Sequence, residues 1–365
     1  MIAQIIAQCA TVGLDNNKEP IHTMRYKLLG RSGLRVSELA LGTMTFGEEW
    51  GWGASKEESK RVFDAYANAG GNFIDTANRY TEGTSERYVG EFVAADRDHF
   101  VVATKYTLKM RDGDPNFSGN HRKNMMHSVD ASLKRLKTDH IDLYWLHAWD
   151  FMTPIDEVLR GLDDLVRAGK ILYIGISDTP AWVISAANVM AELRGWSRFV
   201  ALQLEYSLVQ RGIEREHLPL ARVTDLAVTP WGILGAGILS GKYNREVGAT
   251  GRANRGGGEI PAWKLAVAQT VIEIADELGR QPSQVALNWV RQQAGVIIPI
   301  LGAKTLPQVE DNLKALEFTL SPEQLARLDA ASKIELGFPY DFLNSDGVRF
   351  LVYGGTRDQI DNHRG

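Results

Sequence analysis

The chain has 365 residues, 44% of them hydrophobic, and its 41 Lys and Arg against 45 Asp and Glu leave a formal charge of -4. So small a charge argues against a nucleic-acid partner or an anionic membrane surface, and no run reaches the roughly 18 apolar residues that span a bilayer. The single cysteine, Cys9, excludes an intrachain disulfide and a metal site built from several thiolates. We therefore expect a globular protein of a reducing, cytoplasmic compartment.

The N-terminal segment differs in composition from the chain that follows it. Residues 1–14 are mildly apolar and uncharged, and residues 15–22 are polar. A secretory signal would carry a basic residue before its apolar run, and none precedes Ile5 and Ile6. We expect a loose extension over residues 1–23, a folded domain over 24–335, and a tail over 336–365 that packs on or near that domain.

Short apolar, β-branched runs alternate with segments of helical periodicity along the folded domain. The eight candidate strands are residues 39–41, 72–74, 100–103, 141–146, 171–176, 199–202, 226–229 and 296–298. The helical segments include residues 57–69, 86–94, 123–136, 155–168, 181–193 and 263–278. Regular alternation of eight strands with helices favours a closed parallel (β/α)8 TIM barrel of the α/β class. Residues 25–36 predict a β-hairpin that caps its bottom.

Residues 242–260 depart from this alternation because they are rich in Gly and Arg. The run Gly256-Gly257-Gly258 indicates either a mobile lid near the seventh strand or an exposed connecting loop. The sequence alone does not choose between them.

Chemically versatile side chains follow the candidate strands. Asp75, Lys105 and His147 come directly after the second, third and fourth strands, and Tyr80 lies in the loop after the second. Taken singly, each has a structural interpretation, such as a turn cap, a solvated strand end or a buried imidazole. Because the strands of such a barrel end at one mouth, we expect all four side chains to meet there. An acid, a phenol, an ammonium and an imidazole together indicate proton transfer.

These motifs resemble those of the aldo-keto reductase superfamily over about residues 26–332. The resemblance rests on the run from Asn72 to Tyr80, Gly83-Thr84-Ser85-Glu86, Ala103-Thr104-Lys105, the run from Asp142 to His147, and Gly175-Ile176-Ser177. It implies a catalytic tetrad of Asp75, Tyr80, Lys105 and His147, in an enzyme that interconverts a carbonyl and an alcohol by hydride transfer. Tyr80 is then the proton donor, with its pKa lowered by Lys105. The branch expected is that of potassium-channel β subunits and their bacterial relatives.

The resemblance also implies a bound nicotinamide dinucleotide. The residues expected to hold it are Thr43, Met44, Asp75, Ser177, Asp178, Gln203, Trp231, Gly232, Ile233, Leu234, Ala236, Lys242, Arg252, Gly302, Lys304, Gln308, Asp311 and Asn312. Trp231 is expected to cover the nicotinamide, with Gln203 at its carboxamide, and Lys304 and Arg252 beside the adenosine 2'-phosphate. NADPH or NADP+ is therefore expected, with NADH less favoured. No G-x-G-x-x-G follows an early strand, which argues against a Rossmann mode of binding.

Two of these positions depart from the family pattern. Gly232-Ile233 stands where many relatives have Ser-Pro, and Asp178 stands where Asn is frequent. The first change removes a hydroxyl that could bind pyrophosphate, and the second removes a carboxamide near the nicotinamide. Neither change alters the four expected catalytic residues.

Aromatic residues are expected to form the wall of the substrate pocket. These are Trp50, Trp52, Tyr106 and Trp149, and they suit aryl aldehydes, cyclic ketones or the apolar faces of sugars equally. The expected partner is a small carbonyl or alcohol, with no nucleic acid and no membrane, and a homo-oligomer is left open.

Two other functions compete with this interpretation. One is a nucleotide-binding regulatory or accessory subunit with little turnover, although such a protein has no need of His147. The other is a metal-dependent barrel hydrolase that uses several histidines. The candidates are His121, His127, His140 and His147. They lack the His-x-His pairing typical of such sites, and we expect no metal.

Overall fold

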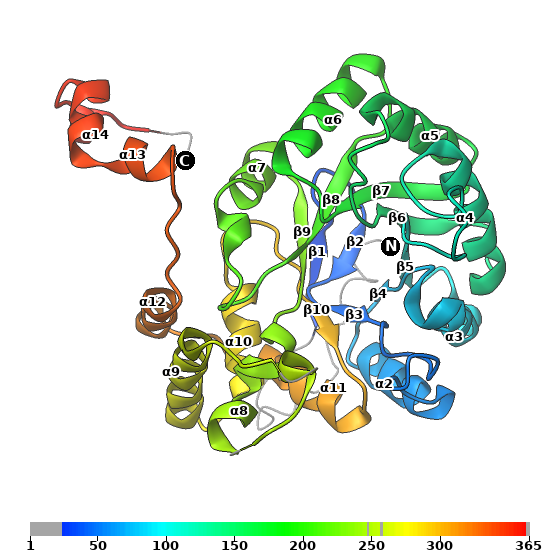
Figure 1. The fold of residues 1–365 in the computed structure, drawn as a ribbon, viewed down its shortest axis with the longest axis horizontal. Coiled ribbons are helices and arrows are strands. Elements are labelled where there is room, and N and C mark those ends of the chain that lie inside the picture. Colours follow the sequence, from blue (N-terminus) through cyan, green and yellow to red (C-terminus); the bar gives the residue numbers. More distant parts are fainter. Residues whose placement is uncertain (1–23, 247, 256–257, 363–365) are drawn as a thin grey trace, which may run out of the picture.

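The computed structural model describes residues 24–246, 248–255 and 258–362. The predicted extension over residues 1–23 and two glycines of the 256–258 run lie outside these ranges. Eight parallel strands form the centre: β3 (Ala40–Gly42), β4 (Phe73–Asp75), β5 (Val101–Tyr106), β6 (Ile141–Leu146), β7 (Ile171–Ser177), β8 (Phe199–Glu205), β9 (Ala227–Trp231) and β10 (Ile300–Gly302). Hydrogen bonds join them in the order β10-β3-β4-β5-β6-β7-β8-β9, and a bridge between Val228 and Ile297 closes the ring. The predicted barrel is therefore confirmed (Figure 1).

Helices surround this ring and follow the strands in alternation. They are α2 (Lys56–Asn68), α3 (Thr84–Val93), α4 (Arg122–Leu136), α5 (Ile155–Arg167), α6 (Ala181–Arg194), α7 (His217–Thr224), α8 (Lys242–Arg245), α9 (Ala262–Leu278), α10 (Pro282–Arg291), α11 (Leu306–Leu313) and α12 (Pro322–Ala331). Helix α5 illustrates why they form, because Val158, Leu162 and Leu165 recur on one buried face while charged residues occupy the other. All six predicted helical segments are confirmed.

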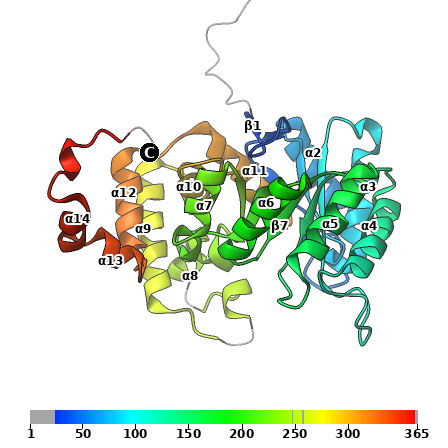
Figure 2. The same cartoon turned by 90° about the horizontal axis from the view of Figure 1, so that it is seen from above.

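A hairpin closes the bottom of the barrel, as predicted. Strands β1 (Tyr26–Leu28) and β2 (Arg35–Ser37) pair antiparallel. Gly30 has a φ of 54°, and a Cβ there would lie 2.2 Å from the carbonyl oxygen of Val200. Figure 2 shows β1 and helix α8 at opposite ends of the barrel. The hairpin thus blocks the end away from the carboxyl termini of the strands.

The eighth strand begins later than the sequence indicates. The apolar run from Val296 to Ile298 is largely buried and bridges to β9, but the strand itself is β10 over Ile300–Gly302. Pro299 separates the two, and a proline has no N–H to donate to a ladder. The prediction therefore found the correct segment and misplaced its strand by a few residues.

Strand parity decides which side chains reach the barrel interior. Phe73, Ala103 and Trp145 are buried inside the ring, and side chains two residues further along a strand point to the same side. Asp75, Lys105 and His147 occupy those next inward positions. The polar side chains at the mouth of the barrel therefore lie next to the packed interior side chains of the same strands.

The tail extends beyond α12 and carries two short helices, α13 (Tyr340–Asn344) and α14 (Asp346–Tyr353). The guanidinium of Arg215 donates to the carbonyl oxygen of Glu335 at 2.8 Å, which fixes the tail to the barrel at that point. Beyond it, a hydrogen bond between Tyr340 and Glu216 holds the start of α13, and the rest of α13 and α14 stands apart from the barrel (Figure 1). Within the described ranges, no helix is both long and apolar enough to cross a membrane.

Candidate active site

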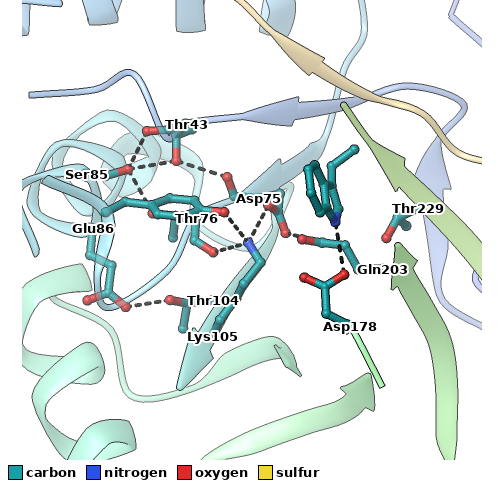
Figure 3. Close-up of polar contacts among 12 residues, drawn as sticks. Thr43, Asp75, Thr76, Ser85, Glu86, Thr104, Lys105, Asp178, Gln203 and Thr229 are labelled. Carbon is teal, nitrogen blue, oxygen red and sulfur yellow. Dashed lines mark hydrogen bonds and ion pairs between the residues drawn. The ribbon is translucent and has the colours of Figure 1, made fainter. Parts of the chain in front are cut away.

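A buried lysine organises the mouth of the barrel. The Lys105 ammonium is fully buried and donates to Asp75 Oδ2 at 2.6 Å, to the carbonyl oxygen of Thr76 at 2.8 Å and to Tyr80 Oη at 3.1 Å. An ammonium has three N–H groups, so every one of them has an acceptor. The structure thus brings Asp75, Lys105 and Tyr80 into one hydrogen-bonded set. Figure 3 shows the contacts of Lys105 with Asp75 and Thr76.

A constrained turn returns the chain over the mouth after β4. Thr81, Glu82 and Gly83 have φ values of 46°, 55° and 84°, a left-handed run that non-glycine residues rarely adopt. The Thr81 hydroxyl holds this turn by donating to the carbonyl oxygen of Phe46 at 2.6 Å. The turn directly follows Tyr80 and keeps its phenol beside Lys105.

The direction of the Tyr80 pKa shift differs from the sequence-based expectation, whereas Lys105 is charged as expected. Burial raises the pKa of Tyr80 above its usual value, and the opposing effect of Lys105 does not overcome it. Burial also lowers the pKa of Lys105, but Asp75 and Tyr80 more than compensate, so the net shift is upward. The prediction of a lowered Tyr80 pKa is therefore wrong for the protein alone. At neutral pH the pair is a phenol beside an ammonium, the form that can donate a proton.

His147 completes the expected tetrad. Its ring centre lies 6.0 Å from that of Tyr80, with the ring planes at 79°. Burial, assisted by the charge of Lys105, places the pKa of His147 well below its usual value, so the imidazole is neutral. Its Nδ1 is buried without a hydrogen-bond partner among the described residues. The ring is therefore held by packing and can contribute a neutral N–H.

Gln203 and Trp231 contact carboxylates at the mouth. Gln203 Nε2 donates to Asp75 Oδ1 at 2.9 Å, so both carboxylate oxygens of Asp75 are occupied. Trp231 Nε1 donates to Asp178 Oδ1 at 3.3 Å. The amide of Gln203, expected at the nicotinamide carboxamide, is thus engaged with Asp75 across the barrel (Figure 3).

An aromatic ladder borders Tyr80. The Trp50 ring lies 6.5 Å from the Tyr80 ring and 5.6 Å from that of Trp52. Trp149 is partly buried and packs against the core. Tyr106 does not belong to this wall, because inward Lys105 precedes it on the strand and alternation turns Tyr106 outward. Its ring is buried and stacks on Tyr144 at 5.4 Å, so the prediction of Tyr106 in the substrate pocket is wrong.

The loop after β9 is a series of tight turns. Positive φ values occur at Gly232, Gly235, Ala236, Gly237 and Gly241. The N–H groups of Gly235, Gly237 and Gly241 donate to carbonyl oxygens of the loop, and turns of this kind can present other N–H groups to an anion. A dinucleotide, whose phosphates are its most charged part, fits this feature.

Cationic residues lie on the two loops expected at the adenosine end. Lys304 and Arg252 are exposed, and the backbone N–H of Lys304 donates to Gln308 Oε1 at 2.8 Å. The Lys242 ammonium donates to the carbonyl oxygen of Thr250 at 3.0 Å. Lys304 and Arg252 therefore have charges available to a phosphate, whereas Lys242 braces its own loop.

Asp311 lies at the contact between α11 and α10. Its carboxylate accepts from Ser283 Oγ at 2.9 Å and from Gln284 Nε2 at 2.8 Å, which ties α11 to α10. Each oxygen of this carboxylate thus already accepts one hydrogen bond from α10, and the cofactor role of Asp311 stays a prediction. The other expected cofactor residues divide into buried Thr43, Ser177, Ile233 and Asn312, half-buried Met44 and Leu234, and exposed Gly302.

Comparison with known proteins identifies the family. Residues 38–333 match the model of the aldo/keto reductase family. The chain belongs to the aldo/keto reductase family. It is therefore an oxidoreductase built on a TIM barrel.

Fungal proteins are among the relatives of this aldo/keto reductase. The chain is 39% identical to a norsolorinic acid reductase of Emericella nidulans over 322 residues, 86% of this chain and 82% of that protein. It is 38% identical to the aryl-alcohol dehydrogenase, NADP(+), of Phanerodontia chrysosporium over 345 residues, 88% of each chain. Norsolorinic acid reductase B of Dothistroma septosporum is 37% identical over 364 residues, 95% of this chain and 92% of that protein. The predicted potassium-channel β-subunit branch is thus corrected to this group of relatives.

A buried ion pair supports the catalytic strand and was not assigned a role from the sequence. Glu86 is fully buried and accepts from Thr104 Oγ1 and from Arg135 Nε, each at 2.5 Å. Thr104 directly precedes Lys105, so this contact fixes the strand from its outer side. Glu86 belongs to the Gly-Thr-Ser-Glu motif that the sequence analysis used. Its partner Arg135 lies 49 residues away, and no nearby sequence pattern indicates that the two residues pair.

Asn78 is the second residue in the site without an assigned role. It is fully buried two positions before Tyr80, and both atoms of its amide lack a hydrogen-bond partner among the described residues. A buried amide without partners is costly and is unusual outside functional sites. Its place within the Asp75–Tyr80 motif was the only available signal.

The histidines of the rejected metal site are dispersed. His121 Nδ1 caps α4 by accepting from the backbone N–H of Asn124, His127 packs against Phe117, and His140 contacts Asp139. In the part of the chain that the structure describes, no group of three or more His, Cys, Asp or Glu side chains is placed to bind a metal.

The Asp178 carboxyl couples protonation to folding. Partial desolvation raises the pKa of Asp178 to about 6, although the residue is exposed and the Trp231 hydrogen bond opposes the shift. The folded state therefore holds this proton more tightly than the unfolded chain, and the carboxylate destabilises the fold above about pH 6.

The substitution Asp178→Asn removes the charge and keeps an oxygen that can accept from Trp231. We expect the variant to melt at a higher temperature than wild type at about pH 7.5, and at nearly the same temperature at about pH 4. Thermal unfolding across this range would contradict the assignment if the gap grew toward low pH.

Proposed function

We propose that this aldo/keto reductase interconverts an aryl aldehyde or ketone with the corresponding alcohol, using NADPH or NADP+. The observation that carries the proposal is the 3.1 Å hydrogen bond between Tyr80 Oη and the buried Lys105 ammonium. A phenol in this setting is a proton donor with a cation already in place to stabilise the phenolate it leaves behind. Among the residues that the structure describes, no other group at the mouth combines these properties.

Each member of the tetrad has a separate task in this proposal. The bound nicotinamide supplies the hydride, which no side chain can provide. Tyr80 Oη gives its proton to the carbonyl oxygen during reduction and removes it during oxidation. Lys105 stabilises the phenolate, and Asp75 balances the Lys105 charge. His147, neutral and close to Tyr80, orients the same oxygen, and one such donor is typically worth on the order of 3 kcal/mol in the barrier.

The aromatic ladder supports the choice of aryl substrates. The Trp50 ring contacts the Tyr80 ring edge-on, with the ring centres 6.5 Å apart, and it also contacts the Trp52 ring. A flat aromatic substrate bound beside Trp50 therefore has its carbonyl near Tyr80. The names of the relatives agree, since one is an aryl-alcohol dehydrogenase and others are norsolorinic acid reductases.

The single cysteine and the nicotinamide cofactor also support a cytoplasmic site of action.

Cofactor choice follows from the charges on the adenosine side. Hydrogen bonds to charged groups contribute about 1.5–3 kcal/mol, so loss of one phosphate contact weakens binding about tenfold or more. Lys304→Ala is therefore expected to raise the KM for NADPH about tenfold and to change that for NADH much less. Lys314→Ala is the matched control, because Lys314 is an exposed lysine at the other end of helix α11 from Lys304. It should change neither KM. Equal effects of Lys304→Ala on both cofactors would place the phosphate elsewhere.

A direct assay tests the proposed function. Purified protein with NADPH and 4-nitrobenzaldehyde is expected to lose absorbance at 340 nm, and NADP+ with the matching benzyl alcohol is expected to gain it. Sugars and cyclic ketones form the comparison panel. Tight NADPH binding with no oxidation by any carbonyl would overturn the proposal and favour a nucleotide-binding regulatory subunit.

A further inference from the structure

The C-terminal tail exposes an unusual amount of apolar surface. Helices α13 and α14 have 5 and 8 residues, and α13 contacts mainly α14. The exposed apolar side chains of the tail are Phe338, Phe342, Leu343, Phe350, Leu351, Val352, Tyr353 and Ile360. Helices shorter than about 12 residues are marginal in water unless another surface supports them. The tail therefore requires a surface that it does not find on α13 and α14 alone.

The size of this surface is that of a protein–protein interface. At about 100 Å² for each exposed side chain, the eight residues present roughly 800 Å², which is the area one partner contributes to a standard interface. The largest apolar patch on a typical monomer is about 300–600 Å². Summed over its eight residues, the apolar exposure of the tail is larger than one such patch.

A second apolar surface lies on α6. Trp182, Ala186, Val189 and Leu193 are all exposed, and their spacing of four, three and four residues places them along one side of the helix. The opposite side of α6 is buried against the barrel through residues such as Ile184 and Ala191. The helix is consequently apolar on two faces, and only one of them has a partner. We refer to the exposed residues as the α6 stripe.

The tail does not cover the α6 stripe of its own chain. Arg215 holds the carbonyl oxygen of Glu335, and Tyr340 hydrogen-bonds Glu216, so the start of the tail is fixed beside α7. From there α13 and α14 lead away from the barrel and lie far from α6 (Figure 1). This geometry directs the tail outward to another molecule.

We propose that the tail of one chain packs its apolar side chains on the α6 stripe of a second copy, and that the second copy returns the contact. A two-fold arrangement makes both contacts identical and leaves no unpaired tail, so the assembly closes as a dimer. The two tails and two stripes together bury more than the roughly 1,200 Å² that a stable interface needs. The catalytic residues are not part of this contact.

Light scattering during size exclusion tests the assembly on the full-length chain. Wild type is expected at twice the chain mass of 40.5 kDa. The double change Phe350→Ser with Leu351→Ser, and separately Leu193→Glu, should each give a monomer. Asp358→Asn in the tail and Glu192→Gln on α6 are exposed polar controls that should remain dimeric. Circular dichroism and NADPH binding of the monomeric variants show that the barrel is folded.

Cross-linking between differently labelled chains shows whether the contact is made in trans. One chain carries Leu193→Cys and the other Phe350→Cys, both with Cys9→Ser, and a short bis-maleimide is added to their mixture. A product of twice the chain mass that contains both labels is expected only in the mixture. A monomeric wild type would overturn the proposal. So would a dimer unaffected by the tail and α6 changes, or an intrachain link in a chain that carries both cysteines.

Discussion

Replacing Tyr80 by phenylalanine is expected to lower turnover of an aryl aldehyde by about 10²- to 10⁴-fold, the range attributed to a positioned general acid. The change removes one oxygen, and with it the phenol hydroxyl that the Lys105 ammonium contacts at 3.1 Å. NADPH affinity should change little, because Tyr80 Oη faces the site of the carbonyl oxygen in the proposed scheme. Steady-state kcat with 4-nitrobenzaldehyde and a fluorescence titration with NADPH measure the two effects separately.

Tyr106→Phe is the matched control for this experiment. Tyr106 directly follows Lys105 in sequence, but its ring is outside the barrel and its hydroxyl donates to the carbonyl oxygen of Asn120 at 3.3 Å. Turnover of Tyr106→Phe should stay within a few-fold of wild type. If Tyr80→Phe behaved in the same way, Tyr80 would not be the acid.

Removing Arg135 is expected to cause the largest loss of stability among single changes at the site. Glu86 is fully buried, and Arg135 Nε is its cationic partner at 2.5 Å. Breaking a buried ion pair from one side leaves a charge without compensation and typically costs 3–5 kcal/mol, so Arg135→Met should lower the free energy of unfolding by about that amount. Turnover should fall as well, because Thr104 contacts Glu86 beside Lys105.

Two further variants separate charge from packing in this prediction. Lys134→Met alters an exposed neighbour on the same helix and should change stability by about 0.5 kcal/mol or less. Glu86→Gln combined with Arg135→Met removes the stranded charge and should recover part of the loss. Equilibrium unfolding in urea measures all three proteins. A loss below about 1 kcal/mol for Arg135→Met would contradict the role of this ion pair in stability.

Strand parity explains why the sequence could place Asp75, Lys105 and His147 at the same mouth of the barrel. Asp75, Lys105 and His147 each end an apolar run, and in a parallel barrel every such end opens at one mouth. Tyr80 lies in the loop after β4, and the family motif identified it as the candidate proton donor. Applied to Tyr106, the same parity rule predicts a side chain outside the barrel. Tyr106 was placed in the substrate pocket because it is adjacent to Lys105 in sequence.

The contacts that sequence reasoning missed join residues far apart in the chain. Gln203 reaches Asp75 across 128 positions, and Asp311 is occupied by Ser283 on the neighbouring helix. No local pattern reports such pairs, because they depend on how strands and helices pack. The pKa of Tyr80 belongs to the same class, since the balance between burial and the Lys105 charge requires coordinates.

The most direct test is a crystal structure of the protein with NADP+ and an aryl alcohol bound together. We predict that the alcohol oxygen lies within hydrogen-bond distance of both Tyr80 Oη and a ring nitrogen of His147. The nicotinamide should lie on the Trp231 side of the mouth, with its reacting carbon facing the alcohol carbon. An alcohol oxygen directed away from Tyr80, or a nicotinamide on the far side of Trp50, would contradict the account.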